Sequence, residues 1–208
     1  MPELGLFPLP LVLVPTERIP LHIFEPRYRE LIRECLERDE EFGLVLATGD
    51  GAVHEIGTRA GVAQVVEELE DGRMNIVVEG RDRFRLLELT SGRSFATGAV
   101  EEVLDEDDPP DTANRERALE VFRDLAETAG AEVDLPDAES PLLDFELAAR
   151  VEFGVEAKQE LLASTSPRER MTKLVALLET ALEALRLERE LQHRASGNGK
   201  VSPLAPEP

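Results

Sequence analysis

The pattern of apolar residues changes once along this chain of 208 residues, at the segment 105–112. Before this segment, apolar residues form short runs separated by turns that contain Gly and Asp, which is typical of β-strands. After it, they recur every three or four residues, which indicates amphipathic helices. A β-rich first part followed by helices predicts an α+β fold and disfavours a layered α/β fold.

The first part carries a clear hairpin signal. Residues 60–69 and 74–79 are β-rich runs joined by Glu70-Asp71-Gly72-Arg73, and Asp-Gly between two such runs favours a tight turn. Further strands are expected at 42–47, 84–89 and 95–104. Together with the extended segment 6–24, these runs predict a small β-barrel of about six strands with one helix.

That helix is expected to begin at Pro26, because five prolines between residues 6 and 29 keep the preceding chain extended and proline is favoured at the first helical position. Glu25 and Arg27 are predicted to tie the strand-to-helix turn to neighbours such as Arg83 or the 71–73 turn. The helix should bury one face, and the extended stretch should supply barrel core. The expected helix face is Tyr28, Leu31, Ile32, Cys35 and Leu36, and the expected core residues are Phe7, Leu11, Leu13, Leu21, Ile23 and Phe24.

The segment 105–112 is acidic and contains two prolines, and seven of the eleven residues from Glu101 to Asp111 are acidic. We interpret it as a solvated linker between domains. A metal site is disfavoured, because the segment lacks the glycine-pivoted spacing of a calcium loop. No metal and no cofactor are therefore predicted.

Helices are expected beyond the linker. A capping box at Ser166-Pro167-Arg168-Glu169 opens the last and longest one, whose apolar positions predict packing against the other helices. The other expected helices cover 113–128, 141–153 and 156–163. The predicted division is a barrel domain (1–108), a helical domain (109–194) and a disordered tail (195–208).

Composition narrows the possible partners. A formal net charge of −21 argues against nucleic acid and against an anionic membrane, because both are bound mainly through Lys and Arg. Cys35 is the only cysteine, so no intrachain disulfide can form, and a reducing cytoplasm is the expected location. The apolar N-terminus lacks the basic region of a signal peptide, and no run is long enough to span a membrane.

Residues for catalysis are scarce. His22 lies in the proline-rich stretch and is expected to be satisfied by backbone, while His54 and His193 show no spacing typical of a metal site. Arg81, Arg83 and Arg85 alternate as on one face of a strand. They could bind an acidic ligand, but pairing with the protein's own carboxylates is the favoured interpretation. No catalytic residue is assigned.

Several motifs together resemble a known family. The segments LFPLPLVLVP, IPLHIFEPRYRELI, FGLVLATG and IGTRAGVAQVVEELEDGRMNIVVEGRDRFRLLEL are similar to the N-terminal substrate-binding domain of Lon-type ATP-dependent proteases. The resemblance implies a PUA-like β-barrel and a role in recognising proteins or peptides. The chain shows no Walker motif, so it is similar to free-standing LON-domain proteins rather than to a complete protease.

The leading functional hypothesis is a non-enzymatic module that binds unfolded or tagged polypeptides. One form of this hypothesis is an adaptor to a separate protease. It would use an apolar groove between barrel and helices, or strand addition at a barrel edge. The alternatives are a PUA-like binder of RNA or nucleotides and an unrecognised hydrolase that uses paired carboxylates or His22. The oligomeric state is left open. The residues predicted to bind peptide are Phe24, Glu25, Arg27 and Tyr28.

Overall fold

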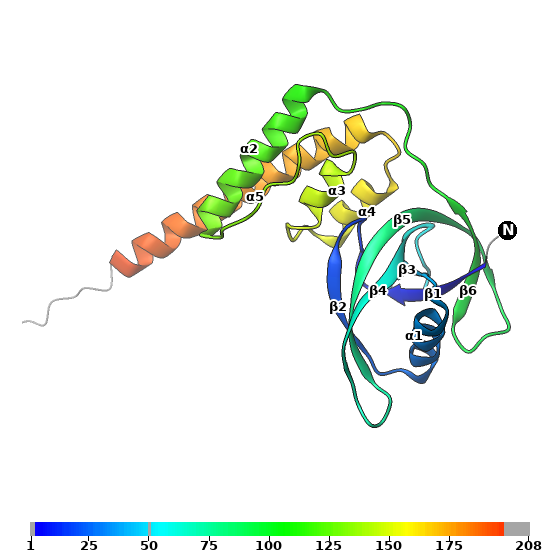
Figure 1. The fold of residues 1–208 in the computed structure, drawn as a ribbon. Helices are drawn as coiled ribbons and strands as arrows, with labels where there is room; N and C mark the ends of the chain where they lie inside the picture. Colours follow the sequence, from blue (N-terminus) through cyan, green and yellow to red (C-terminus); the bar gives the residue numbers. More distant parts are fainter. Residues whose placement is uncertain (1–2, 50, 198–208) are drawn as a thin grey trace, which may run out of the picture.

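The computed structural model of this protein describes residues 3–49 and 51–197. Over these residues it contains six strands and five helices. The strands curl into a barrel, the later helices pack beside one end of it, and the last helix extends away from the rest (Figure 1). The predicted α+β architecture, with its long C-terminal helix, is confirmed.

The sheet closes on itself. Its order is β2-β5-β4-β3-β1-β6, and an additional pairing between β5 and β6 completes the ring, with β2 added beside the first half of β5. β1 and β3 pair in parallel, and the other pairings between named strands are antiparallel. The strands are β1 (Glu3–Leu9), β2 (Arg18–Ile23), β3 (Phe42–Leu46), β4 (Ile56–Glu68), β5 (Met74–Thr90) and β6 (Ala96–Glu102).

β5 is one strand of 17 residues where the sequence predicted two short ones. Its first half pairs with β2 and its second half with β6. The break in the apolar pattern near Gly80 therefore marks a change of partner and not a turn. A Cβ at Gly80 would lie 2.2 Å from the carbonyl oxygen of Val14, so the close approach of the chain between β1 and β2 requires glycine here.

α1 (Pro26–Arg38) begins at the predicted proline and closes one end of the barrel. Four of its five expected apolar residues are buried, but Leu36 is 43% exposed. The prediction that Phe24 belongs to the core is wrong, because Phe24 is 60% exposed. Ile23, the last residue of β2, points inward, and the next side chain therefore points outward.

The helical part is close to the prediction, with one correction. α2 (Thr112–Ala129) and α4 (Val155–Ala163) match the expected helices, but α3 covers only Leu143–Ala148 instead of 141–153. The chain leaves the helix after Ala148, and Phe153 is buried in the same core as the helices. α5 runs from Pro167 to Gly197, so the helix enters the tail predicted to be disordered, and residues 198–208 lie outside the described part of the chain.

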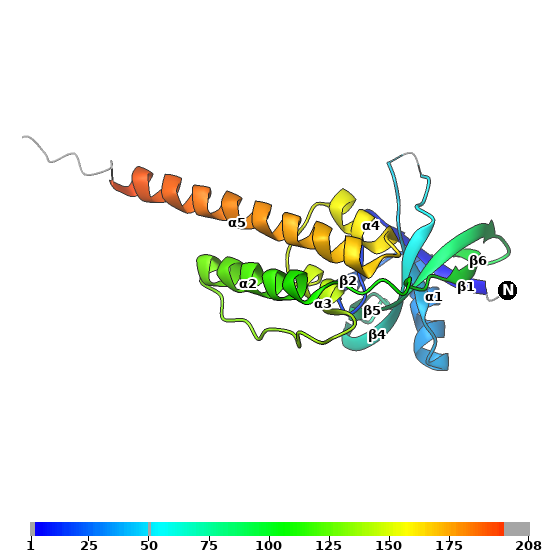
Figure 2. The ribbon, with the colours of Figure 1, turned by 90° about the horizontal axis from the view of Figure 1, so that it is seen from above.

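α2 and α5 lie side by side, and the last turns of α5 project beyond the other helices (Figure 2). The buried face of α5 packs on α2 and α3, as the apolar pattern predicted. The helical core, which is the cluster of buried residues around α5, also includes barrel residues that face the helices. Its α5 members are Met171, Leu174, Leu178 and Leu182, and its barrel-side members are Val12, Val14, Leu46 and Ile56.

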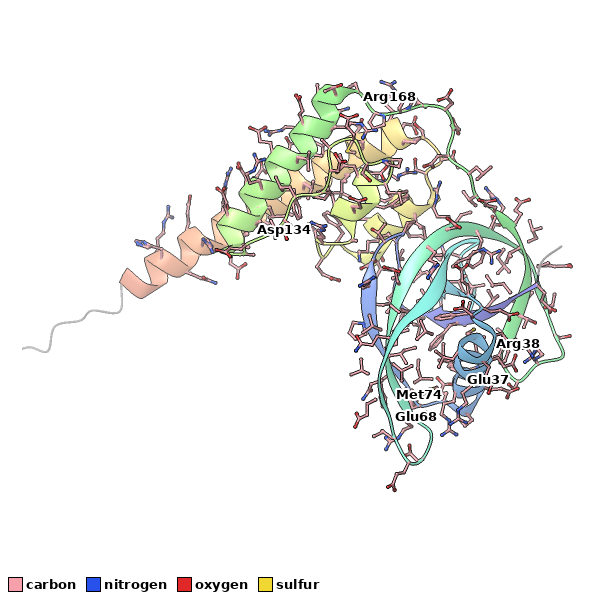
Figure 3. All side chains as sticks on the ribbon, viewed as in Figure 1. Glu37, Arg38, Glu68, Met74, Asp134 and Arg168 are labelled. Atoms are coloured by element: carbon pink, nitrogen blue, oxygen red, sulfur yellow. The ribbon has the colours of Figure 1, made fainter. Side chains whose placement is uncertain are left out.

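The segment 105–112 joins the barrel to the helices, and most of its residues are exposed, as expected of a solvated segment, but it also contacts α5. Asp108 accepts hydrogen bonds from the Ser166 hydroxyl at 2.7 Å and from Nε of Arg168 at 2.8 Å. Arg168, labelled in Figure 3, lies in the first turn of α5. The backbone N–H of Glu106 donates to the carbonyl of Thr165 at 2.8 Å. Asp108 thus attaches this segment to the start of α5, although its partners are 58 to 60 residues away in the sequence.

Candidate polypeptide-binding site

The four residues predicted to bind peptide lie at the turn from β2 into α1. Glu25 and Arg27 form an exposed ion pair at 2.8 Å, and the Arg27 guanidinium lies 4.5 Å from the ring centre of Tyr28. Tyr28 is buried and stacks on Phe7 at 4.0 Å between ring centres, and burial raises the pKa of its phenol. Phe24 is the one of the four that offers an exposed apolar surface.

Glu25 and Arg27 do not make the contacts that were expected of them. Each pairs with the other, whereas the 71–73 turn is contacted by Arg29, which donates to the carbonyl of Asp71. Arg83 lies on the side of the barrel that faces the helices. The strand-to-helix turn is therefore held by local contacts, and the α1 residues that contact the hairpin are Arg29 and Arg33.

The prediction that backbone groups hydrogen-bond to the His22 ring is wrong, because the partner is the side chain of Asn75. Its Nδ1 lies 2.7 Å from Oδ1 of Asn75, whose amide donates to Glu67 at 3.0 Å, so a polar row crosses β2, β5 and β4. The ring of His22 also stacks against Phe24, with ring centres 6.0 Å apart. The contacts of His22 that the structure shows are with Asn75 and Phe24, and neither side chain is a nucleophile.

The three arginines of β5 are paired with carboxylates, which confirms the favoured interpretation. Arg81 lies 3.6 Å from Glu41, and Arg85 lies 3.4 Å from Glu101. Arg83 is buried and donates to the carbonyl oxygens of Leu162 and Ser164 at 2.9 and 2.6 Å. Cationic groups engaged in this way are poorly placed to neutralise nucleic-acid phosphates.

A buried ion network joins the barrel, the acidic segment and α5. Arg170 is 1% exposed, and it contacts Asp144 at 2.6 Å and Asp105 at 2.7 Å. Asp105 also pairs with Arg83. The guanidinium of Arg170 lies 4.2 Å from the ring centre of Phe145. Burial opposes ionisation of Asp105, but hydrogen bonds and charge from the two arginines outweigh it and lower its pKa.

A second buried ion pair joins the barrel to α4. Lys158 of α4 donates to Glu17, and both residues are less than 9% exposed. The other carboxylate oxygen of Glu17 accepts from the backbone N–H of Val14 at 3.0 Å. Such a pair fixes geometry because each charge is costly to bury without the other. α4 is therefore held at a defined position against the barrel.

A cavity of about 530 Å³ lies beside this pair, between the barrel and α4. The chain between β3 and β4 contributes one side of the cavity, and α4 contributes the other. Its volume is within the range of ligand pockets, and more of its surface is apolar than polar. The described residues that line it are Pro10, Leu46, Ala47, Thr48, Gly49, His54, Val155, Glu156, Gln159 and Glu160.

Gln159 is a buried polar residue that lines this cavity, called the junction cavity below. The side chain is 7% exposed, and its Nε2 donates to the carbonyl of Ile56 at 3.0 Å. This bond fixes which end of the amide is the oxygen. Among the described residues, Oε1 of Gln159 is the buried side-chain atom without a hydrogen-bond partner. A buried acceptor of this kind is costly unless a donor reaches it.

The described part of the chain was also compared with the requirements of a metal site, a reactive thiol and a membrane-spanning helix. Within residues 3–49 and 51–197, no group of three or more His, Cys, Asp or Glu is arranged to hold a metal ion. Cys35 is buried in the barrel core as predicted, and burial raises the pKa of its thiol to about 11. None of the helices within the same residues is both long and apolar enough to cross a membrane.

Comparison with known proteins gives a consistent result. Residues 3–180 match the family described as the ATP-dependent protease La (LON) substrate-binding domain. A solved Lon N-terminal domain protein from Xanthomonas campestris is 26% identical, with a TM-score of 0.69, covering 85% of this chain and 98% of that one. The N-terminal domain of Mycobacterium avium complex Lon protease shares the fold, at 16% identity and a TM-score of 0.63, over 86% and 98% of the two chains.

Complete proteases are also similar to this chain. Lon protease of Paraburkholderia phytofirmans is 28% identical over 95% of this chain and 27% of its own length, and Lon protease 1 of Hydrogenovibrio crunogenus is 25% identical over 88% and 24%. The chain thus spans about a quarter of these curated relatives. The closed barrel followed by packed helices defines a barrel-and-helix domain of the Lon N-terminal type. The chain belongs to the LON substrate-binding domain family.

Proposed function

We propose that this protein is a non-enzymatic module that binds unfolded or tagged polypeptides. The observation that carries the proposal is the junction cavity, an open and largely apolar recess of about 530 Å³ where barrel and helices meet. Unfolded chains expose apolar side chains that native proteins bury, and a recess of this kind can take them up. Membership of a substrate-binding family supports the same function.

We propose further that the module acts as an adaptor for a separate protease in the cytoplasm. The support is the match to the substrate-binding family, together with similarity to full-length Lon proteases over about a quarter of their length. An adaptor of this kind would hold a polypeptide and present it to an enzyme. Co-purification of a protease with the tagged full chain tests this part of the proposal.

The binding function is tested by fluorescence anisotropy with one labelled protein in two states. The reduced and carboxymethylated form is permanently unfolded, and the untreated form is native. We expect the unfolded form to bind at micromolar concentrations of this protein and the native form to remain free. Equal binding of both forms, or of neither, contradicts the proposal.

The predicted role of the β2–α1 turn is tested in the same assay. Phe24→Ala removes its exposed apolar side chain, and Leu104→Ala removes one of similar exposure (68%) just before the acidic segment. Weaker binding with Phe24→Ala alone would support the predicted site. Unchanged binding with both variants would exclude Phe24 as a main contact.

A further inference from the structure

We propose that residues 131–137, which we call the α2–α3 segment, form a ready-made strand that docks on an open sheet edge of another protein, and that this edge carries Lys or Arg. In this interaction the protein supplies the strand, whereas in the proposed function it binds a polypeptide, so the inference does not rest on the junction cavity. Four features of the segment carry it: its extended path, its free main-chain edge, its exposed apolar face and its unpaired carboxylates.

The α2–α3 segment follows an extended path on the surface. The chain makes no turn or bend from Ala131 to Asp137, and it runs back along α2 toward α3 (Figure 2). Pro136 favours an extended conformation at the residue before it. The whole connection between the two helices covers residues 130–142, whereas most connections in compact domains have about 4–6 residues, and long ones are often functional.

Two arginines hold this connection in place through its carbonyl groups. Arg150 donates to the carbonyl of Asp134. Nη1 of Arg115 donates to the carbonyls of Ala138 and Ser140 at 2.9 and 3.1 Å. The segment is therefore ordered before any partner binds, which lowers the entropy cost of the interaction.

One main-chain edge of the segment is free. In an extended chain, the N–H and C=O of one residue point to one side, and those of the next residue point to the other. The carbonyl of Asp134 points toward Arg150, so the main-chain groups of Val133 and Leu135 point away from it. Within the described residues, neither Val133 nor Leu135 makes a main-chain hydrogen bond. A row of such groups is a template for pairing with a second strand.

The segment also has an apolar face that is left exposed. Val133 and Leu135 are 40% and 36% exposed, and neither belongs to an apolar cluster of the described residues. Since alternate residues of an extended chain share a face, these two side chains lie together, and Glu132 and Asp134 lie on the opposite face. An apolar face of this kind suits β-branched side chains on a neighbouring strand.

The charges of the segment identify the partner edge. Four carboxylates lie on the segment and on the turn after it, and none of them forms an ion pair with a described residue; they are Glu132, Asp134, Asp137 and Glu139. The sequence contains no Lys or Arg from Asp124 to Ala149. Proteins often place Lys on open edge strands, where it blocks unwanted pairing. An acidic strand pairs favourably with such an edge and is repelled by an acidic one.

The open edges of this protein's own sheet do not suit the segment, so the occupant is another protein and not a second copy. Among the described strands, β2 pairs only with β5, and it contains Pro20, which lacks the N–H that a paired strand needs. β4 pairs with β3 only as far as Ala60. Its later part has two irregularities in its pairing with β5 and ends in Glu67 and Glu68, which repel an acidic strand.

The probe for this inference is a cyclic β-hairpin peptide whose open edge alternates Val and Lys. Its binding to the isotopically labelled full chain is measured by NMR titration at low ionic strength, where charge attraction is least screened. We expect the main-chain amide signals of Val133 and Leu135 to shift. We also expect this hairpin to bind at least about tenfold more tightly than two altered forms, one with Glu in place of Lys and one with N-methyl groups along the open edge.

Substitutions in the protein separate strand pairing from charge attraction. Val133→Pro removes an N–H from the free edge and should weaken binding of the Lys hairpin about tenfold, whereas Val133→Thr keeps the N–H and the shape and should have little effect. Asp134→Lys should reverse the preference between the Lys and Glu hairpins, and Glu183→Lys, on an exposed face of α5 and with the same change of net charge, should not. Thermal melts establish that each variant is folded, and the N-methylated hairpin tests the same contact on the unsubstituted chain.

Several results would overturn the inference. If the N-methylated hairpin binds as tightly as the Lys hairpin, charge attraction alone is at work. Equal binding of the Lys and Glu hairpins, or binding of neither, also contradicts it. If the full chain dimerises in solution and Val133→Pro abolishes the dimer, the occupant is a second copy and the assigned partner is wrong. The proposed function is tested separately, because Val133→Pro should bind unfolded protein as tightly as the unsubstituted chain does.

Discussion

The interior of the barrel and the junction between barrel and helices are held together by different forces. The barrel core is apolar, and Ile76 and Val78 are at most 1% exposed. The junction shares some apolar contacts but also buries charges, with Arg170 at 1% exposure and Lys158 at 6%. Apolar burial tolerates small shifts, whereas a buried ion must have its partner in place. The position of the helices, and with it the shape of the cavity, therefore depends on a few polar contacts.

The largest expected effect comes from breaking the junction network. Arg170→Met leaves Asp144 buried without its cation, and we expect the free energy of unfolding to fall by about 3–5 kcal/mol. Chemical denaturation measures it. The double variant Arg170→Met with Asp144→Leu should recover part of the loss, because it removes the orphaned charge.

The exposed pair Arg117 and Glu179, at 2.7 Å, provides the control for this prediction. Arg117→Met should lower the free energy of unfolding far less than Arg170→Met does, because exposed ion pairs contribute little. Equal losses for Arg170→Met and Arg117→Met would show that buried ions do not hold the junction.

Truncation in the barrel core should have the next largest effect. Ile76→Ala removes buried methylene and methyl groups and should lower the free energy of unfolding by about 2–5 kcal/mol. Val66, on the neighbouring strand, is 58% exposed, and Val66→Ala serves as control. Ile76→Ala should leave the peptide affinity of the folded protein unchanged, since the residue is not at the junction. A change in that affinity would mean that the two regions are coupled.

A smaller loss of stability is expected when the pH is lowered. Arg170 and Arg83 hold the pKa of Asp105 below its ordinary value of 3.8. A lowered carboxyl pKa contributes stability that is complete above the unfolded-state pKa and disappears as pH falls through the folded-state pKa, so the loss lies below about pH 4. Thermal melts of the unsubstituted chain and of Asp105→Asn should differ at pH 7 and converge in that range. A constant difference would exclude this titration.

The smallest effect is expected at the β2–α1 turn. The sequence assigned Glu25 a role in tying this turn to distant neighbours, but its side chain pairs with Arg27 at the surface and does not cap α1. Glu25→Ala should therefore change the free energy of unfolding, measured by chemical denaturation, by less than about 1 kcal/mol. A loss as large as that of Ile76→Ala would show that the turn is a third stabilising region.

Local signals were sufficient for much of the fold. Pro26 starts α1, Ser166 Oγ accepts from the backbone N–H of Glu169 at the start of α5 as the capping box predicted, and the 60–79 hairpin forms around its Asp-Gly turn. Each of these depends on residues close together in the sequence. Where the fold depended on distant partners, the prediction was incomplete: β5 was divided in two, and the contacts of the acidic segment with α5 were missed.

The candidate site could be predicted only in outline. A groove between barrel and helices was one of two expected binding modes. Neither Gln159 nor the other cavity residues could be identified, because the cavity combines Pro10, the end of β3, the chain between β3 and β4, and α4. A lone glutamine in an amphipathic helix gives no sequence signal. The burial of Gln159 at the cavity is explained by its hydrogen bond to the carbonyl of Ile56, 103 residues away in the sequence.

The sequence by itself determined the family, the α+β class and the positions of the main helices, because turn residues, caps and apolar spacing act over a few residues. Only the tertiary structure decided how the barrel and the helices meet. There, Asp105 lies against Arg170 and Glu17 against Lys158, across 65 and 141 residues. The energy of a buried charge depends on what surrounds it in space, so the partners of Asp105 and Glu17 at this junction could not be identified from the sequence.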